Sequence, residues 1–235
     1  MMLSNTKIVA IIPAAGIGTR MQSLLPKQYL KIDQLTIIEY TMHKLISCEE
    51  INRVVVVINP NDDIFDSLPL AHHPKIMRVY GGNTRAESVL AGLTLVHDNE
   101  WALVHDAARP CVSHKDIQQL INTVIPLNQG GILAVPMVDT IKLASDQHNN
   151  IVVKTLDRSR LWAAMTPQLF LSKILKIALT KALQDGITIT DEASAMEYYG
   201  QHPILVLGRR DNIKITYPED LALAKFYLNE QLISV

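Results

Sequence analysis

Short apolar runs recur along the chain, separated by longer segments in which apolar residues follow a helical spacing. Most of the runs are rich in β-branched residues and are apolar throughout instead of alternating with polar residues. That pattern is typical of strands that are buried on both faces of a parallel sheet. The runs predict six strands, at residues 7–13, 53–59, 76–80, 101–105, 131–136 and 204–207.

The segments between these runs carry signals for helix starts. Three of them have the spacing of a capping box, namely Thr36 with Glu39, Thr84 with Glu87, and Thr216 with Glu219. In such a box the threonine oxygen accepts a free backbone N–H, and the glutamate accepts the N–H of the cap residue. Ser113 is expected to cap a fourth helix in a similar way. Strands that alternate with helices predict an α/β fold, with a doubly wound, mostly parallel sheet flanked by helices.

One segment, residues 138–161, departs from this alternation. Two runs of alternating residues flank a polar stretch at 146–150, which predicts a β-hairpin that projects from the main sheet as an arm. A hairpin of two strands is only marginally stable alone in water. A second subunit is therefore the expected support, and packing on the chain's own domain is the alternative. No repeat or linker divides the sequence, so residues 1–235 are expected to form a single domain.

The composition narrows the class of protein. The chain has 235 residues, 48% of them hydrophobic, which suits one large domain with a sizeable core. Its 22 basic and 23 acidic residues nearly cancel, so a broad nucleic-acid surface is not expected. Cys48 and Cys111 lie far apart without metal-site spacing, and no apolar stretch reaches membrane-spanning length. We expect a cytoplasmic protein that binds neither nucleic acid nor membrane.

The strongest chemical signal follows the first predicted strand. Residues 13–21 read PAAGIGTRM, and Pro26-Lys27-Gln28 comes shortly afterwards. At the carboxyl end of a parallel strand, small residues let the backbone approach a base or phosphate closely, and its N–H groups can face anions. Arg20 adds a forked donor and Lys27 a point charge, and both suit a polyphosphate. The loop therefore predicts a nucleotide site; a tight turn with solvated charges is the alternative.

Two commoner glycine-rich loops do not match. A dinucleotide fingerprint needs a third glycine where Met21 stands, and the second predicted strand ends in Ile58-Asn59-Pro60, without an acid for the ribose. A P-loop needs G-x-x-x-x-G-K-[ST], which the sequence lacks. These differences disfavour a nicotinamide-dependent oxidoreductase and a P-loop enzyme.

A second signal is the run of residues 104–110, VHDAARP. It places Asp106 at the carboxyl end of a buried strand, before residues small enough for a ligand to pass over. Such an acid can hold Mg2+ beside a triphosphate, because Mg2+ prefers oxygen ligands and bridges phosphates. Asp106 is therefore the candidate metal residue, and a turn cap is its alternative role.

Several other groups of residues are, taken singly, only weak evidence for a functional site. Gly81 and Gly82 precede the helix that carries Ser88 and offer a further surface for close approach, although such a pair is more often a plain turn. The remaining groups could each be a cap, a turn or a surface charge: Asp139-Thr140-Ile141-Lys142, Arg158, Thr166-Pro167-Gln168, Thr190-Asp191-Glu192-Ala193 and Asp211-Asn212-Ile213-Lys214.

Taken in order, these motifs resemble the 2-C-methyl-D-erythritol 4-phosphate cytidylyltransferases of the non-mevalonate isoprenoid pathway. The resemblance rests on PAAGIGTRM, PKQ, VHDAARP, DTIK, TPQ, TDEA and DNIKIT, which span nearly the whole chain. It implies a Rossmann-like nucleotide-diphospho-sugar transferase fold. It also implies transfer of CMP from CTP to 2-C-methyl-D-erythritol 4-phosphate with release of pyrophosphate, a requirement for Mg2+, and a homodimer clasped by the arms.

The resemblance further implies a role for each matching residue. Arg20 and Lys27 would stabilise the transition state at the α-phosphate, and Asp106 would sit by the metal. The cytidine site would be lined by Pro13, Ala14, Ala15, Gly16, Gly82, Ser88 and Ala107. The acceptor would be positioned by Arg109, Thr140, Arg158, Thr166 and Lys214, with Thr140 and Arg158 reaching across from the partner's arm.

The chemistry of this transfer agrees with the residues. The nucleophile is a phosphate oxygen that is already anionic near neutral pH, so no general base and no activated serine, cysteine or histidine is needed. Positioning and cationic stabilisation of the phosphates suffice. Two rivals stay open: a cytidylyltransferase for another polyol phosphate such as ribitol 5-phosphate, and a nucleotide-binding regulator. Against the regulator stands the joint presence of Arg20, Lys27 and Asp106.

Overall fold

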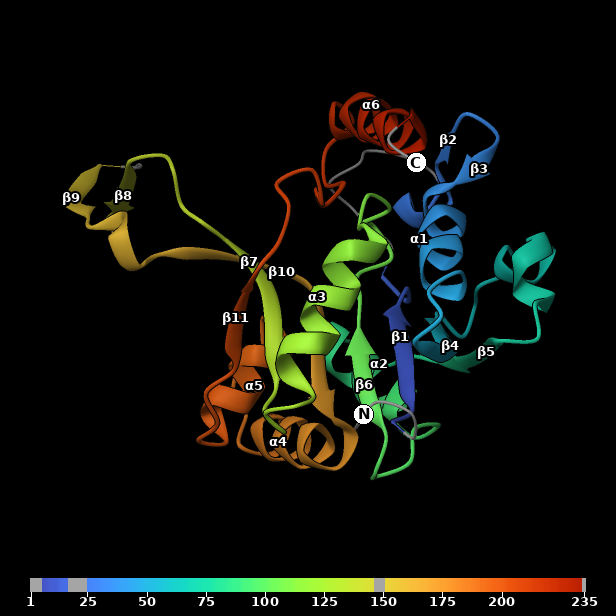
Figure 1. Cartoon of the computed structure of the whole chain (residues 1–235), viewed down its shortest axis with the longest axis horizontal. Helices are drawn as coiled ribbons and strands as arrows, with labels where there is room; N and C mark the ends of the chain where they lie inside the picture. Colours follow the sequence, from blue (N-terminus) through green and yellow to red (C-terminus); the bar gives the residue numbers. More distant parts are fainter. Residues whose placement is uncertain (1–5, 17–24, 146–150, 234–235) are drawn as a thin grey trace.

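The structure, a computed structural model, describes residues 6–16, 25–145 and 151–233. A seven-stranded sheet forms its centre, in the order β11-β7-β10-β6-β1-β4-β5 (Figure 1). The strands are β1 (Ile8–Pro13), β4 (Ile51–Ile58), β5 (Ile76–Tyr80), β6 (Trp101–Val104), β7 (Gly131–Pro136), β10 (Trp162–Leu171) and β11 (Ile204–Leu207). All six predicted strands are present, and their ends differ from the prediction by two residues at most.

β10 is the strand that the hydrophobic pattern does not predict. It pairs antiparallel with β6 and β7, whereas the other neighbouring strands of the sheet pair parallel. Pro167 has no backbone N–H to donate, and the ladder with β7 is irregular between Ala164 and Gln168. A proline in a run normally argues against a central strand, which explains the omission. The prediction of a mostly parallel sheet is nevertheless confirmed.

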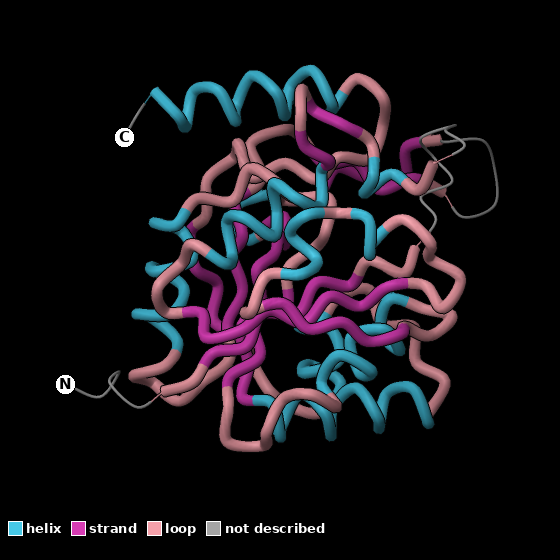
Figure 2. The backbone as a smooth tube through the Cα atoms, turned by 90° about the vertical axis from the view of Figure 1, so that its right-hand side faces the viewer, coloured by secondary structure: helices cyan, strands magenta, loops and turns pink. Residues whose placement is uncertain are grey.

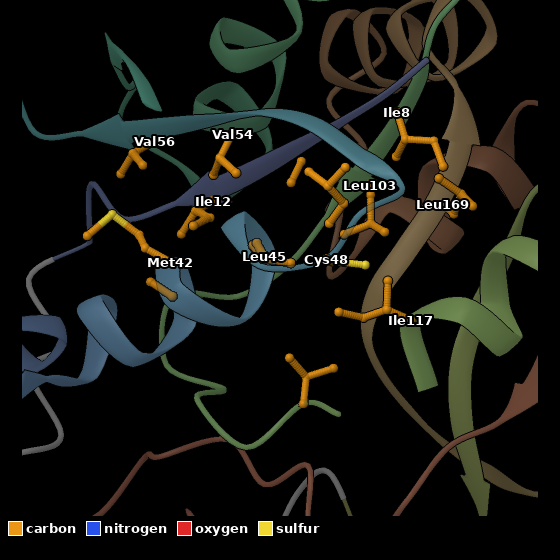
Figure 3. Close-up of a cluster of buried hydrophobic side chains, with 14 of the residues drawn as sticks. Ile8, Ile12, Met42, Leu45, Cys48, Val54, Val56, Leu103, Ile117 and Leu169 are labelled. Carbon is orange, nitrogen blue, oxygen red and sulfur yellow. The ribbon is translucent and has the colours of Figure 1, made fainter. Parts of the chain in front are cut away.

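Helices cover both faces of the sheet, and Figure 2 shows them on either side of the strands. On one face lie α1 (Ile37–Ile46) and α3 (His114–Val124); on the other lie α2 (Arg85–Leu93), α4 (Ser172–Gln184) and α5 (Glu192–Tyr198). In β1, residues 8, 10 and 12 pack in the first cluster, part of which appears in Figure 3, and residues 9 and 11 pack in the second. Because both faces are covered, the strands are apolar throughout.

Three of the four predicted helix starts are confirmed. Capping boxes at Thr36 and Thr84 open α1 and α2, and the Ser113 side chain accepts a backbone N–H of α3. The box predicted at Thr216 is wrong, because the last helix, α6, runs over Asp220–Ile233. The Asp220 carboxylate accepts the backbone N–H groups of residues 216 and 217 at 2.8 and 2.9 Å. An anion in the first turn also interacts favourably with the helix dipole, so Asp220 takes the role expected of Glu219.

The smaller elements complete the body of the chain. They are the hairpin of β2 (Lys31–Ile32) and β3 (Leu35–Thr36) and the 3-10 helices η2 (Lys27–Tyr29), η3 (Phe65–Ser67), η4 (Pro69–His72) and η5 (Arg158–Arg160). Ala224 and Leu228 of α6 pack in a third apolar cluster with Ile32 and Ile37. This cluster holds α6 against the β2–β3 hairpin and the start of α1. None of the helices in the described ranges combines the length and apolarity that crossing a bilayer requires.

The predicted arm is present as β8 (Ile141–Ala144) paired antiparallel with β9 (Val152–Leu156). It extends away from the three layers, at the left of Figure 1. The polar turn expected at 146–150 lies outside the described residues. Ile151, Val152 and Val153 are 61%, 55% and 60% exposed. The arm therefore has no core of its own within the described part of this chain.

Candidate active site

Two adjoining cavities open at the carboxyl ends of the central strands. The first has a volume of about 710 Å3, including the solvent at its mouth. Its lining includes every residue expected at the cytidine site, namely Pro13, Ala14, Ala15, Gly16, Gly82, Ser88 and Ala107. Lys27 lies in the same wall. The other expected catalytic residue, Arg20, lies outside the described residues.

The second cavity measures about 520 Å3 and is lined in part by Arg109 and Thr166, both expected to position the acceptor. Arg85, Asp106 and Lys214 line both cavities. These three side chains therefore form a wall that the two cavities share.

Two expected acceptor residues are not part of either wall. Thr140 and Arg158 lie on the arm and are exposed. The Arg158 guanidinium donates to the backbone carbonyl of Val138, at the base of the same arm. Within one chain, neither residue lines a cavity with the other site residues that the structure describes.

The first cavity depends on close packing between the ends of β1 and β5. A Cβ atom on Gly81 would lie 2.6 Å from Ser88 Oγ and 2.8 Å from Ala15 Cβ, so only glycine fits there. The buried Gln28 donates from Nε2 to the carbonyl of Ala14 at 2.8 Å. This bond ties η2, which carries Lys27, to the loop after β1. The Lys27 ammonium itself donates to the carbonyl of Ile215 at 3.0 Å.

The buried carboxylate of Asp106 is surrounded by cations. Arg85 Nε donates to its Oδ1 at 3.0 Å, and Lys214 Nζ lies 2.8 Å from Oδ2. Arg109 Nε is 3.8 Å from the same Oδ2. Burial raises the pKa of Asp106, but the positive charges, that of Arg85 first, outweigh it and hold the pKa well below its ordinary value. The carboxylate is therefore ionised at neutral pH.

Arg85 and Glu192 also belong to this site, although the sequence analysis assigned neither residue a role in it. Both Nη atoms of Arg85 donate to the Glu192 carboxylate, at 2.6 and 3.0 Å. Arg85 is the first residue of α2 and Glu192 the first of α5, so no spacing in the sequence links them. The available signal was that Arg85 shortly follows the glycine pair and that Glu192 lies within the motif TDEA.

Thr166 and His105 orient the backbone of the second cavity. The backbone N–H of Asp106 donates to Thr166 Oγ1 at 3.0 Å, and Oγ1 lies 3.0 Å from His105 Nδ1. Burial lowers the pKa of His105 to about 4, so the imidazole is neutral at pH 7. Its Nε2 lies 3.0 Å from the carbonyl of Arg109 and must donate, because a carbonyl only accepts. Nδ1 then accepts from the Thr166 hydroxyl, whose proton is engaged inside the protein.

Asn212 fastens the same region from the other side. Its Nδ2 donates to the carbonyl of Thr166 at 2.8 Å, and its own backbone carbonyl accepts from Arg109 Nη1 at 2.7 Å. The Nε of Arg109 is buried and has no hydrogen-bond partner among the described residues. That Nε lies 3.8 Å from Asp106 Oδ2, and the Arg109 side chain contributes a positive charge to the wall of the second cavity. A guanidinium in that position is suited to a phosphate.

The residues of the site could supply one carboxylate ligand to a divalent cation. In the described part of the chain, no group of three or more His, Cys, Asp or Glu side chains comes together as a metal cage. Mg2+ beside a triphosphate needs only one or two carboxylates, because phosphates and water supply the other ligands. Asp106 can serve as that carboxylate if the ion replaces one of its present cationic partners.

Comparison with known proteins identifies the family. The family model described as 2-C-methyl-D-erythritol 4-phosphate cytidylyltransferase matches residues 8–230. The chain is 52% identical over 232 residues to the Escherichia fergusonii protein of that name, covering 99% of this chain and 98% of the relative.

Solved structures agree with that match. The crystal structure of the Francisella tularensis enzyme of the same name superposes with a TM-score of 0.82 at 39% identity, covering 94% of this chain and 100% of the other. The enzyme from Thermus thermophilus gives 0.77 at 26% identity, covering 94% and 98%. The expected fold and the resemblance are confirmed, and this chain belongs to the family of 2-C-methyl-D-erythritol 4-phosphate cytidylyltransferases.

Proposed function

We propose that this enzyme transfers CMP from CTP to 2-C-methyl-D-erythritol 4-phosphate at the wall shared by its two cavities. CTP occupies the first cavity and the acceptor occupies the second. A phosphate oxygen of the acceptor attacks the α-phosphorus of CTP, and the bond from that phosphorus to the bridging oxygen breaks. The products are 4-diphosphocytidyl-2-C-methyl-D-erythritol and pyrophosphate. The observation that carries the proposal is that Arg85, Asp106 and Lys214 line both cavities.

The main barrier to this reaction is the approach of two anions. Lys214 and Arg109 lie beside the second cavity and suit the acceptor's phosphate, while Lys27 lies in the wall of the first. Fixed cations aimed at developing charge need no reorganisation as the reaction proceeds. Pro13 to Gly16, Gly82, Ser88 and Ala107 supply a surface of small residues for cytidine, and Arg20 with Lys27 stabilises charge at the α-phosphate. Thr166 orders the Asp106 peptide beside the acceptor.

Mg2+ is the proposed cofactor. When bound, it would neutralise part of the charge on the triphosphate and the leaving pyrophosphate. The residue proposed to hold it is Asp106, which lines the cavity that CTP would fill.

The assembly that we propose is a homodimer clasped by the arms of residues 138–161. The support is the exposed apolar surface of the hairpin, which a second copy of the chain would cover. Thr140 and Arg158 would then position the acceptor in the partner's site. We further propose a cytoplasmic location without a nucleic-acid or membrane partner, in keeping with the balanced charge and the two free, buried cysteines.

The substrate assignment predicts which acceptors support turnover. With CTP and Mg2+, pyrophosphate release should be fast with 2-C-methyl-D-erythritol 4-phosphate and at least about 100-fold slower, in kcat/KM, with ribitol 5-phosphate or erythritol 4-phosphate. A coupled assay of pyrophosphate over this panel makes the measurement. Equal or faster turnover of ribitol 5-phosphate would reassign the acceptor, and no release with any acceptor would favour a non-catalytic nucleotide-binding protein.

The phosphate loop predicts that Lys27→Ala and Arg20→Ala each lower kcat by about 10²–10³-fold, because each removes a cation from developing charge. The KM for CTP should rise much less. Steady-state kinetics with both substrates test this, and Lys31→Ala, an exposed lysine on β2, is the matched control. Near-normal turnover in either variant would remove that residue from the transition state.

The metal proposal predicts that excess chelator abolishes activity and that Asp106→Asn raises the Mg2+ concentration needed for half-maximal rate by about tenfold or more, through loss of a ligand charge. Mg2+ titrations at saturating substrates provide the measurement. A second measurement, the KM for the acceptor at saturating Mg2+, tests whether Asp106 instead holds the surrounding cations in place. An unchanged Mg2+ dependence with a raised acceptor KM would assign Asp106 to those cations alone.

The arm predicts complementation between two inactive variants. If Arg158 acts in the partner's site, a mixed dimer of Arg158→Ala and Lys27→Ala subunits has one site with both defects and one with neither. With random subunit exchange, about half of the dimers are mixed, so roughly a quarter of the wild-type activity should return. Mixing Lys27→Ala with Lys214→Ala is the control, since both residues serve the same chain's site and no sound site can form. No recovery after verified exchange would place Arg158 in its own subunit's site or in the arm alone.

A further inference from the structure

Arg85 is held between two carboxylates that come from different parts of the fold. On one side its Nη1 and Nη2 donate to Glu192 at 2.6 and 3.0 Å. On the other side its Nε donates to Asp106 Oδ1 at 3.0 Å, and Nη2 lies at the same distance from that oxygen. The guanidinium therefore joins the start of α2, the start of α5 and the loop after β6.

These contacts leave Arg85 little capacity to bind substrate itself. Every one of its nitrogens is engaged by a carboxylate, although the side chain lies in the wall of both cavities. A guanidinium carries five N–H donors, and these contacts engage the donors of Nε and Nη2 and one of the two on Nη1. A phosphate could therefore accept a hydrogen bond only from the remaining Nη1 N–H without displacing a carboxylate, so Arg85 is placed to act mainly through Asp106.

Glu192 serves Arg85 and lines neither cavity. Its side chain is fully buried, at 0% exposure, and it stands at the amino-terminal end of α5, where the helix dipole favours an anion. A buried carboxylate is costly unless it is paired, so its presence there needs a partner as strong as a forked guanidinium. The fork in turn fixes where the Arg85 guanidinium lies.

The position of Arg85 decides which way Asp106 faces. With Oδ1 taken by Arg85, Oδ2 is the oxygen left for the acceptor-side cations, Lys214 at 2.8 Å and Arg109 at 3.8 Å. A carboxylate that was free to rotate would not hold both cations at the second cavity. The order of contacts therefore runs from Glu192 through Arg85 and Asp106 to Lys214 and Arg109.

We propose that the Arg85–Glu192 pair is a positioning device that orients Asp106, so that Lys214 and Arg109 face the acceptor's phosphate. The inference rests on the proposed roles of Lys214 and Arg109 and adds two residues that act on acceptor binding without touching the acceptor. The chain of contacts ends on the acceptor-side cations, so loss of the pair should weaken acceptor binding much more than CTP binding.

The experiment compares Glu192→Gln and Arg85→Gln with the double variant that carries both changes. Arg85→Gln leaves the buried Glu192 carboxylate without its cation, and Glu192→Gln leaves the Arg85 guanidinium with Asp106 but without Glu192, so each should lower the midpoint of thermal unfolding. The double variant replaces the ion pair by two amides of similar size, which can restore stability because residue 192 then carries no unpaired charge and Asp106 keeps Lys214 and Arg109. Glu197→Gln, the same change at an exposed position of α5, is the matched control.

In all three variants we expect the acceptor KM to rise by about tenfold or more, while the CTP KM stays within about twofold of wild type. The double variant is decisive, because a merely structural pair would recover its acceptor KM together with its stability. Recovery of both, or an equal rise in both KM values, would overturn the proposal.

Two further variants keep the test decisive. If the double variant does not fold, Arg85→Lys keeps the charge but cannot fork between two carboxylates, so it should show the same rise in acceptor KM. A wild-type acceptor KM in a folded Arg85→Lys enzyme would overturn the proposal.

Lys214→Ala separates the two levels of inference. If Lys214→Ala leaves the acceptor KM unchanged, the proposed acceptor site is wrong; if it raises that KM and the Arg85 and Glu192 variants do not, only the positioning role fails.

Discussion

The ionised carboxylate of Asp106, buried at the carboxyl end of β6, is the interaction on which the site depends. Burying a lone carboxylate costs several kcal/mol even after relaxation, on the order of 5, so the fold must bring cations to it. It does so with Arg85 from α2, Arg109 from the following turn and Lys214 from the loop before α6. Segments that lie more than 100 residues apart in the sequence thereby meet at the Asp106 carboxylate, and the two cavities also meet there.

This arrangement suits a reaction whose reactants are both anionic. A cluster of cations without Asp106 would repel itself, and a carboxylate without the cations would repel the phosphates. Together they leave a net positive wall whose members are held in place before substrate arrives, which is the condition for electrostatic stabilisation without reorganisation. Because the nucleophile is already charged, the buried neutral His105 serves to order the backbone and is not needed as a base.

The sequence predicted much of the scaffold because the signals for it are local. A strand that is buried on both faces shows as an uninterrupted apolar run, such as residues 54–58. A capping box shows as two residues within one helical turn, such as Thr36 and Glu39. The prediction was wrong where a neighbouring residue could make the same bond, as Asp220 does in place of Glu219. It missed β10, because Pro167 disrupts the local pattern while pairing with strands on both sides supplies the stability.

By itself the sequence determined the α/β layering, the small-residue loop at 13–16, the acid at Asp106 and the projecting arm, because each depends on residues close together along the chain. Only the tertiary structure decided what Asp106 contacts. Arg85 and Glu192 are each the first residue of a helix, 107 positions apart, and nothing in the local pattern links one to the other. Their pairing follows from how α2 and α5 pack on the same face of the sheet, and packing at that distance is fixed by the whole core and not by any one segment.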